Sequence, residues 1–405
     1  MRSAQPIVVQ EPAAFHSILQ SAEALLSHKL HATVGLQPLE TFGDYPHVLR
    51  CRVWQAPTTF PTTVIVKQAK QRGEQAYDPM HTDLHSLAPR LFNDWAGVQF
   101  LDEIGARHQL APSLYGGDRA LGYIVLEDLG DVTSFDQVLL TDGVARAEQV
   151  IVQWASYLGE MHAASIGHAE RFHHLRTQLG PIQPMYVIDA RDLRAALIQL
   201  QPLFDRLGLV LPAGYDEDIA GVLHAIADPE PFLAFTHGDP CLHNLFPLST
   251  GAVMLDFEWG GYRHALTDAV YSRMLFPTCY GIHRLPRAIL DQSEAVYRAA
   301  LRERCSAATD DDAFGRATVV ACAYWTLKTL QWYLEAALDV DDAWTETRRL
   351  WLLARLEAFV EATEEFGFFL ALGQMIRMLV RTLHEQWPDV DANVPYFPAF
   401  VTLPH

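Results

Sequence analysis

Two kinds of hydrophobic spacing follow one another along the chain, and they predict a strand-rich first part and a helical remainder. Apolar residues at helical spacing predict a short amphipathic helix over residues 11–28, packed on the outside of the strands that come after it. Alternating and β-branched runs predict five strands, at Ala32–Leu39, His47–Trp54, Thr62–Gln68, Ser113–Asp118 and Gly122–Glu127. A longer helix is predicted between the third and fourth strands, over Pro89–Ile104.

From residue 131 onwards, apolar positions recur at helical spacing almost throughout. They predict helices over residues 143–164, 191–207, 215–227, 265–277, 287–306, 311–338, 346–364 and 367–386. Glycine and proline punctuation predicts loops over residues 167–190, and the proline-rich residues 388–405 predict an extended strap. Because 405 residues exceed one typical domain, we expect two lobes or two domains.

The chain is acidic, with a formal net charge of −19. Such a surface repels phosphate backbones, so nucleic acid is not an expected partner. Electrostatic steering would favour a cationic substrate such as an amine or amino sugar, although many proteins are acidic simply for solubility. The sequence has no signal-peptide pattern and no apolar run of about twenty residues. We therefore expect neither a membrane span nor a membrane partner.

The five cysteines are scattered along the chain, at Cys51, Cys241, Cys279, Cys305 and Cys322. They are odd in number and include no C-x-x-C pair. This pattern predicts reduced thiols in a cytoplasmic protein, and it argues against a disulfide framework or a zinc site.

The most informative stretch runs from Phe235 to Glu258 and joins H-G-D-x-x-x-x-N to a strand-like run that ends in D-F-E. Asp239 follows a strand edge on a tight turn, where a carboxylate can accept a proton from an attacking hydroxyl. Asn244 and Asp256 offer the hard oxygen ligands that magnesium prefers. This layout suits phosphoryl transfer. The alternative is a chance pattern, with a buried aspartate and asparagine that cap a turn.

The two motifs together resemble the catalytic and metal-binding loops of the aminoglycoside phosphotransferase and choline kinase family. The resemblance implies a bilobal, protein-kinase-like α+β fold, with lobes at residues 1–128 and 129–405. It also implies transfer of phosphate from ATP or GTP, with Mg²⁺, to a hydroxyl of a small molecule. It implies that Asp239 is the catalytic base, that Asn244 and Asp256 bind metal, and that His237 braces the loop. Asp268 matches the family's second structural aspartate, although a simple helix-start carboxylate would use the same residue.

Lys67 ends the β-branched run of the third predicted strand, where kinase-like proteins place the lysine that contacts the nucleotide phosphates. A solvated lysine on an edge strand is the alternative. The family pairs this lysine with a glutamate early in the next helix. The best match here is the shorter Asp94, whose alternative role is that of a helix-start carboxylate. The turn at Gly43 and Asp44 would cover the phosphates in such a lobe, but a plain hairpin turn explains it equally well.

Glu127 ends the fifth predicted strand, and Asp128 and Leu129 follow it, at the position of the family's hinge. The resemblance assigns them to nucleotide binding, because backbone groups there meet the purine edge. A nucleotide-binding pseudokinase or regulatory module without turnover is the alternative to a small-molecule kinase. A protein kinase is disfavoured, because His-Gly-Asp replaces His-Arg-Asp and no Ala-Pro-Glu segment follows. The acceptor, the choice of nucleotide and the oligomeric state are left open.

Four aromatic residues fall at near-helical spacing late in the chain: Tyr324, Trp325, Trp332 and Tyr333. They would suit a cage around an alkylammonium ion. Packing within the core is the favoured interpretation.

Overall fold

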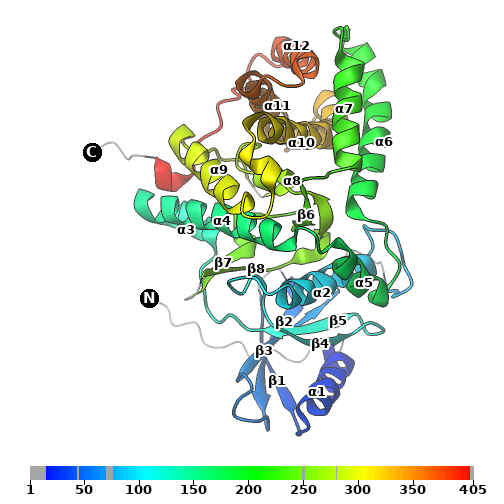
Figure 1. Cartoon of the computed structure of the whole chain (residues 1–405), viewed down its shortest axis with the longest axis vertical. Helices are drawn as coiled ribbons and strands as arrows, with labels where there is room; N and C mark the ends of the chain where they lie inside the picture. The colour runs from blue at the N-terminus through cyan, green and yellow to red at the C-terminus, as the bar shows by residue number, and fades with distance from the viewer. Residues whose placement is uncertain (1–14, 43–44, 70–75, 249–250, 280, 402–405) are drawn as a thin grey trace. The chain divides into compact units, whose positions relative to one another are not determined.

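The structure, a computed structural model, describes residues 15–42, 45–69, 76–248, 251–279 and 281–401. The chain divides into two compact units, whose helices and strands are labelled in Figure 1. The first unit contains Met1–Val132, Glu170–Ile182 and Val253–Gly260, and the second contains Thr133–Ala169, Gln183–Ala252 and Gly261–His405. The first unit therefore takes in two later segments, whereas the sequence prediction placed one continuous lobe at residues 1–128. Segments this short carry no domain signal of their own.

Five strands form an antiparallel sheet in the first unit, in the order β1-β2-β3-β5-β4. Their bounds are β1 (Gly35–Phe42), β2 (Tyr45–Trp54), β3 (Thr63–Gln68), β4 (Leu114–Asp118) and β5 (Tyr123–Glu127). The five predicted strands are thus present, with ends that shift by a few residues. Strand β3 lies between β2 and β5, so it is a central strand and not an edge.

Helix α1 (His16–Leu30) packs on one face of this sheet. Its buried residues, such as Ile18 and Leu26, share a core with Val64, Val66 and other alternate residues of the strands. Side chains alternate between the two faces of a strand, which explains why every second residue of β3 enters this core. The predicted outer position of the first helix agrees with this packing.

Three further elements complete the first unit, namely α2 (Leu87–Glu103), α5 (Ala169–Leu179) and the 3₁₀ turn η3 (Phe257–Trp259). Helix α2 is buried along most of its length and contacts η3 extensively. Phe100 of α2 meets Phe172 of α5 edge to face, at a centroid distance of 5.6 Å. Residues from three distant parts of the sequence therefore share one interior.

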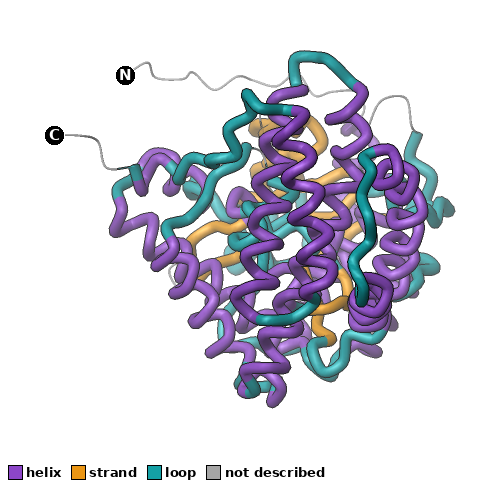
Figure 2. The backbone as a smooth tube through the Cα atoms, turned by 90° about the horizontal axis from the view of Figure 1, so that it is seen from above, coloured by secondary structure: helices purple, strands orange, loops and turns teal. Residues whose placement is uncertain are grey.

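The second unit is mostly helical, as predicted, and Figure 2 shows how much of the chain is helix. Its helices are α3 (Phe135–Thr141), α4 (Val144–Ser165), α6 (Met185–Arg206), α7 (Tyr215–Ala227), α8 (Leu266–Ala269), α9 (Arg287–Leu301), α10 (Asp311–Asp339), α11 (Thr345–Phe366) and α12 (Leu370–Gln386). Helix α10 contacts α11, α6 and α7, and α12 contacts α11 and α7 (Figure 1). The sheet and these helices together confirm the α+β class.

A short antiparallel pair, β6 (Leu233–Thr236) and β9 (Gly261–His264), lies among the helices of the second unit. The turn η2 (Leu242–Asn244) and the strand β7 (Leu245–Leu248) follow β6. Strand β8 (Gly251–Met254) carries the chain from the second unit into the first. Among the described helices, none is long and apolar enough to cross a membrane.

Two predicted elements are wrong. Residues 169–179 form helix α5 and not a loop, because Gly167 and Gly180 lie outside its ends and do not interrupt it. The helix predicted over residues 265–277 ends after one turn, at Ala269. Leu275 and Phe276 then adopt left-handed backbone angles, with φ of 58° and 50°, which the hydrophobic spacing cannot reveal.

Candidate active site

Lys67 projects from the central strand β3, on the face opposite the α1 core. Its Nζ lies 2.6 Å from Asp94 Oδ2 of α2 and 2.5 Å from Asp256 Oδ1, just after β8. All three residues belong to the first unit. Burial alone would lower the pKa of Lys67, but the carboxylates of Asp256 and Asp94 outweigh that effect and raise it above its ordinary value. Lys67 is therefore a cation held in place by two carboxylates. The alternative interpretation, a solvated lysine on an edge strand, does not describe it.

Asp94 connects the lysine to the D-F-E turn. Its second oxygen, Oδ1, accepts a hydrogen bond from the Phe257 backbone N–H at 2.9 Å. Its side chain is only 2% exposed, whereas that of Asp256 is 39% exposed. Asp256 also has a left-handed backbone, with φ of 70°, a region that aspartate tolerates better than most residues. The more exposed Asp256 carboxylate is thus the one suited to a ligand.

Sequence reasoning missed the polar residues that hold this turn in place. The Arg90 guanidinium of α2 pairs with the Glu258 carboxylate and lies over the Trp259 ring, 5.0 Å from its centroid. The Asn93 amide donates to the Glu258 backbone oxygen at 3.1 Å, and Arg176 Nε of α5 donates to Asn93 Oδ1 at 2.7 Å. Each is a common residue type without a motif, and only the distant pairing identifies it.

Several charged side chains lie close together around Lys67 and affect one another's pKa values. Burial, and next the Asp256 carboxylate, raise the pKa of Glu258 above its ordinary value, against the lowering effect of Lys67 and Arg90. Burial also lowers the pKa of Arg176 to about 9. A group of this kind, with displaced pKa values around a fixed cation, is typical of functional sites.

The three predicted hinge residues lie at the end of β5 in the first unit: Glu127 is its last residue, and Asp128 and Leu129 follow it. Glu127 uses its carboxylate within the fold, where Oε2 accepts from the Ser113 backbone N–H at 2.9 Å and from Gln109 Nε2 at 2.6 Å. Asp128 lies 3.0 Å from Arg50 Nε, and Leu129 is half-buried. The carboxylates of Glu127 and Asp128 are thus both engaged within the fold. The predicted phosphate-covering turn at Gly43 and Asp44 lies outside the described residues.

The H-G-D loop belongs to the second unit and begins where β6 ends. The buried Asp268 carboxylate accepts from two consecutive backbone N–H groups, those of His237 at 2.6 Å and Gly238 at 3.1 Å. Gly238 has a φ of 80°, which favours glycine at the sharp turn. His237 Nδ1 accepts from the Asp239 backbone N–H at 3.2 Å. The loop is thus fixed on both sides of the turn.

Asp268 is a fully buried carboxylate of α8. His162 Nε2 of α4 lies 3.5 Å from its Oδ2, and His162 Nδ1 contacts the Tyr297 hydroxyl at 2.9 Å. Burial would raise the pKa of Asp268, but the imidazoles of His162 and His237 and the Arg263 guanidinium hold it below its ordinary value. The ionised form is therefore the one that the fold favours.

Asp239 and Asn244 lie close together on this loop. The Asn244 side-chain amide donates to the Asp239 backbone oxygen at 3.1 Å, which leaves its amide oxygen as the atom suited to a cation. The Thr278 hydroxyl donates to Asp239 Oδ1, and the Tyr271 hydroxyl contacts Thr278 Oγ1 at 3.0 Å. Thr278 is 39 residues from Asp239, so no local pattern pointed to it.

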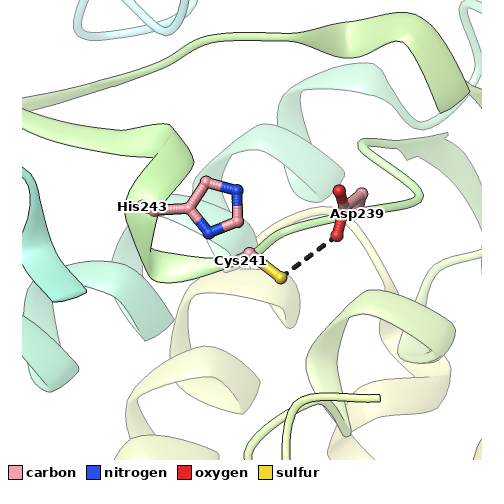
Figure 3. A group of neighbouring side chains, drawn as sticks. All are labelled: Asp239, Cys241 and His243. Carbon is pink, nitrogen blue, oxygen red and sulfur yellow. Dashed lines mark hydrogen bonds between the residues drawn. The ribbon is translucent and has the colours of Figure 1, made fainter. Parts of the chain in front are cut away.

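The cysteine prediction is wrong at one pair. Cys241 and Cys279 form a disulfide, with their Cα atoms 5.7 Å apart, while the buried Cys51, Cys305 and Cys322 are free. The partners are separated by 38 positions, so their sequence spacing carried no signal. Cys241 also belongs to a group with Asp239 and His243 whose ligand-type atoms lie within 4.8 Å of one another (Figure 3). The sequence prediction had taken the absence of a C-x-x-C pair as evidence against a disulfide framework and against a zinc site.

The late aromatic residues divide between the core and the surface. Tyr324 and Trp325 are buried, and Trp325 Nε1 donates to the Thr267 backbone oxygen at 2.7 Å. Trp332 is 39% exposed and has Lys328 Nζ 5.5 Å from its ring centroid. Core packing accounts for the first two residues.

The chain is similar to several solved structures at low sequence identity. One is a choline/ethanolamine kinase family protein from Mesorhizobium loti, with 17% identity over 89% of this chain and 99% of that chain and a TM-score of 0.45. Another is choline kinase from Cryptosporidium parvum, with 13% identity, 85% and 93% coverage and a TM-score of 0.45. A third is an ADP-bound aminoglycoside phosphotransferase, with 12% identity, 89% and 99% coverage and a TM-score of 0.43. No protein-family model and no curated protein matches the chain.

Proposed function

We propose that the chain is a magnesium-dependent phosphotransferase of the aminoglycoside phosphotransferase and choline kinase type. It would move the γ-phosphoryl group of ATP or GTP to a hydroxyl of a small molecule. The observation that carries this proposal is the contact of Lys67 with Asp94 and Asp256. Phosphoryl transfer needs a lysine for the phosphates and an aspartate for the metal, and the proposed pair is supplied by residues 189 positions apart.

The H-G-D loop supports the same proposal from the second unit. Asp239 would orient the acceptor hydroxyl and accept its proton, and Asp268 and His237 would hold the backbone that carries it. Because the transition state of phosphoryl transfer is loose, catalysis comes mostly from positioning and charge stabilisation. A loop that is hydrogen-bonded on both sides of its turn meets the need for positioning.

Asn244 and Asp256 are proposed as the magnesium ligands, since each offers hard oxygen atoms. The Asn244 amide nitrogen is engaged by the Asp239 carbonyl, and the Asp256 carboxylate is the exposed one of its own cluster, so each residue taken by itself suits a cation. When bound, the metal neutralises charge on the transferred phosphoryl group. Lys67, held by Asp94, would position the nucleotide phosphates, and the backbone of residues 127–129 would meet the purine.

The acceptor is proposed to carry an amine, as an aminoglycoside, an amino sugar or a choline-like alcohol does. The support is the net charge of −19, which attracts cations over distances of about a Debye length, ~10 Å at 0.1 M salt.

The first test is ATP and GTP consumption with magnesium over a panel of aminoglycosides, amino sugars, neutral sugars and choline-like amines. We expect turnover with one acceptor class. Asp239→Asn should abolish turnover while nucleotide affinity stays nearly unchanged, because the variant loses the proton acceptor and keeps the size of the side chain. Asp312→Asn, at an exposed position of α10, is the matched control and should retain turnover.

Turnover by Asp239→Asn at the control's rate would remove Asp239 from its proposed role. If the whole panel is silent, thermal unfolding with nucleotide and magnesium separates the remaining cases. Stabilisation without turnover would favour the alternative of a nucleotide-binding pseudokinase or regulatory module. No stabilisation would count against the nucleotide site itself.

A further inference from the structure

Three side chains with different metal-binding chemistry occupy every second position of a short stretch that starts at the aspartate of the H-G-D motif. Asp239, Cys241 and His243 each offer a ligand atom, and these atoms all lie within 4.8 Å of one another. Cys241 Sγ is 3.1 Å from Asp239 Oδ1. Figure 3 shows the three side chains extending from one short stretch of loop, with the His243 ring close to Cys241. Their spacing of i, i+2, i+4 differs from the C-x-x-C spacing that usually indicates a zinc site.

The loop backbone holds these residues in place. Cys241 itself has extended backbone angles, φ −62° and ψ 144°. Its N–H donates to the Asp239 carbonyl at 2.8 Å, and its own carbonyl accepts from the Asn244 N–H at 2.9 Å. Trp154 Nε1 of α4 donates to the Pro240 carbonyl at 2.9 Å. A cation would therefore find the ligands already gathered.

The chemistry of this group differs from that of the proposed magnesium ligands. Thiolate, imidazole and carboxylate are the usual zinc ligands, and three of them with one open position make an accessible zinc site. Magnesium instead selects oxygen atoms alone. Asp239 and His243 are half-buried, so an ion can reach the group from solvent, while the buried Cys241 sulfur supplies the soft ligand.

We propose that Asp239, Cys241 and His243 bind one Zn²⁺ ion when Cys241 is reduced, and that the disulfide to Cys279 abolishes the site. A disulfide sulfur has no thiolate charge with which to bind the ion. A phosphine or a low-molecular-weight thiol supplies the two electrons that open the disulfide, and each sulfur takes up one proton. On metal binding, the Cys241 thiol releases its proton and its sulfur electron pair forms the bond to zinc.

Zinc at this group would occupy the carboxylate that the proposed mechanism uses to accept a proton. Phosphate transfer should therefore be inhibited by zinc in reduced protein and unaffected in oxidised protein. This consequence rests on the proposed phosphotransferase activity, whereas the binding of zinc does not. The disulfide also ties the loop to the segment that carries Thr278, whose hydroxyl donates to Asp239.

The test is zinc affinity, measured by competition with a chromophoric zinc indicator. Protein is first reduced with a phosphine or oxidised with a low-molecular-weight disulfide, and the reagent is then removed. We expect one zinc ion per reduced chain and none at the same concentration for the oxidised chain. Cys279→Ser keeps the Cys241 thiol and cannot form the disulfide, so it should bind zinc without any reducing treatment.

Cys241→Ser and His243→Ala should weaken binding beyond the ~10–100-fold that loss of an outer-shell partner costs. Cys305→Ser, at a buried free cysteine outside the proposed site, is the matched control and should bind as the wild type does. Equal zinc affinity of reduced and oxidised wild type would overturn the proposal without any variant. Unchanged affinity in a folded His243→Ala protein would also overturn it. Zinc binding without turnover on any acceptor, and without stabilisation by nucleotide and magnesium, would leave this inference standing and remove the proposed function.

Discussion

Asp94 carries two tasks with one carboxylate, since one oxygen pairs with Lys67 and the other accepts from the Phe257 N–H. A buried ion pair gains stability only where hydrogen bonds satisfy the remaining lone pairs. Asp94 meets this condition, since each of its two oxygens has a partner. The helix that carries Asp94 is itself buried against the turn, so a short side chain reaches both partners.

Asp94→Asn should lower the free energy of unfolding by about 1.5–3 kcal/mol, the usual loss for a hydrogen bond to a charged group. It should also weaken nucleotide binding, because Lys67 would be held by Asp256 alone. Asp102→Asn, an exposed site on the same helix, is the control and should change neither quantity. Urea unfolding measures the free energy of unfolding, and nucleotide titration measures the nucleotide affinity. An unchanged free energy of unfolding would mean that the pair contributes nothing net.

The buried Asp268 carboxylate leads to a prediction about how the free energy of unfolding depends on pH. Its folded pKa lies below the ordinary value of 3.8, so its stabilising effect is present above that value and is lost as pH falls through the folded value. Asp268→Asn should therefore be less stable at pH 7 by about 3–5 kcal/mol, as expected when one partner of a buried pair is removed. The difference should shrink below pH ~4.

Urea unfolding of the wild type and Asp268→Asn from pH 7 down to acid pH is the measurement. Asp341→Asn, at an exposed loop position, serves as the control and should follow the wild type at every pH. If the difference in free energy of unfolding between wild type and Asp268→Asn stays constant down to acid pH, ionisation of Asp268 is not the cause of that difference.

Between elements, a buried arginine connects α9 to α11. Arg273 contacts Glu294 of α9 at 2.7 Å through both Nε and Nη2, and Glu365 of α11 at 2.8 Å through Nη1. Its side chain is 4% exposed. Arg287 also pairs with Glu365, at 2.7 Å, but is 59% exposed. One carboxylate therefore receives a buried and an exposed guanidinium, which allows a direct comparison.

Arg273→Lys should lower the free energy of unfolding by about 2–4 kcal/mol, because an ammonium cannot reproduce the forked contacts to two carboxylates in a buried position. Arg287→Lys should cost less than about 1 kcal/mol, as exposed pairs do. Thermal or urea unfolding of both variants gives the comparison. Similar losses for the two would show that burial does not decide the strength of these pairs.

The elements that the sequence predicted well are those whose signal is local. The alternation in β3 and the contiguous residues of the H-G-D and D-F-E motifs can be recognised without knowing the fold. Thr278, Cys279 and Arg176 could not be found in this way, because their roles depend on partners 38 or more positions distant. The helix predicted over residues 265–277 was too long for a related reason. The left-handed backbone of Leu275 and Phe276, beyond the end of α8, follows from no local hydrophobic pattern.

At the scale of the whole molecule, the first unit is discontinuous in sequence. Three of its buried interactions join the N-terminal stretch to the later segments, namely Lys67 with Asp256, Arg90 with Glu258 and Asn93 with Arg176. A fragment of residues 1–132 lacks the later partner of each pair, so Lys67 keeps only Asp94, and Arg90 and Asn93 lose these contacts altogether. Buried polar groups left without partners cost about 1–3 kcal/mol each. Together these losses approach the lower end of the ~5–15 kcal/mol stability of a typical domain.

We therefore expect the fragment of residues 1–132, expressed alone, to show no cooperative unfolding transition in urea. The matched control is the full chain with a protease site inserted after Val132 and cleaved once folded. Its two pieces should co-elute in size-exclusion chromatography and separate in urea, because the larger piece supplies both missing segments. A cooperative transition in the isolated fragment would show that residues 170–182 and 253–260 are dispensable for folding. In that case the polar contacts around Lys67 would serve the site more than the stability of the unit.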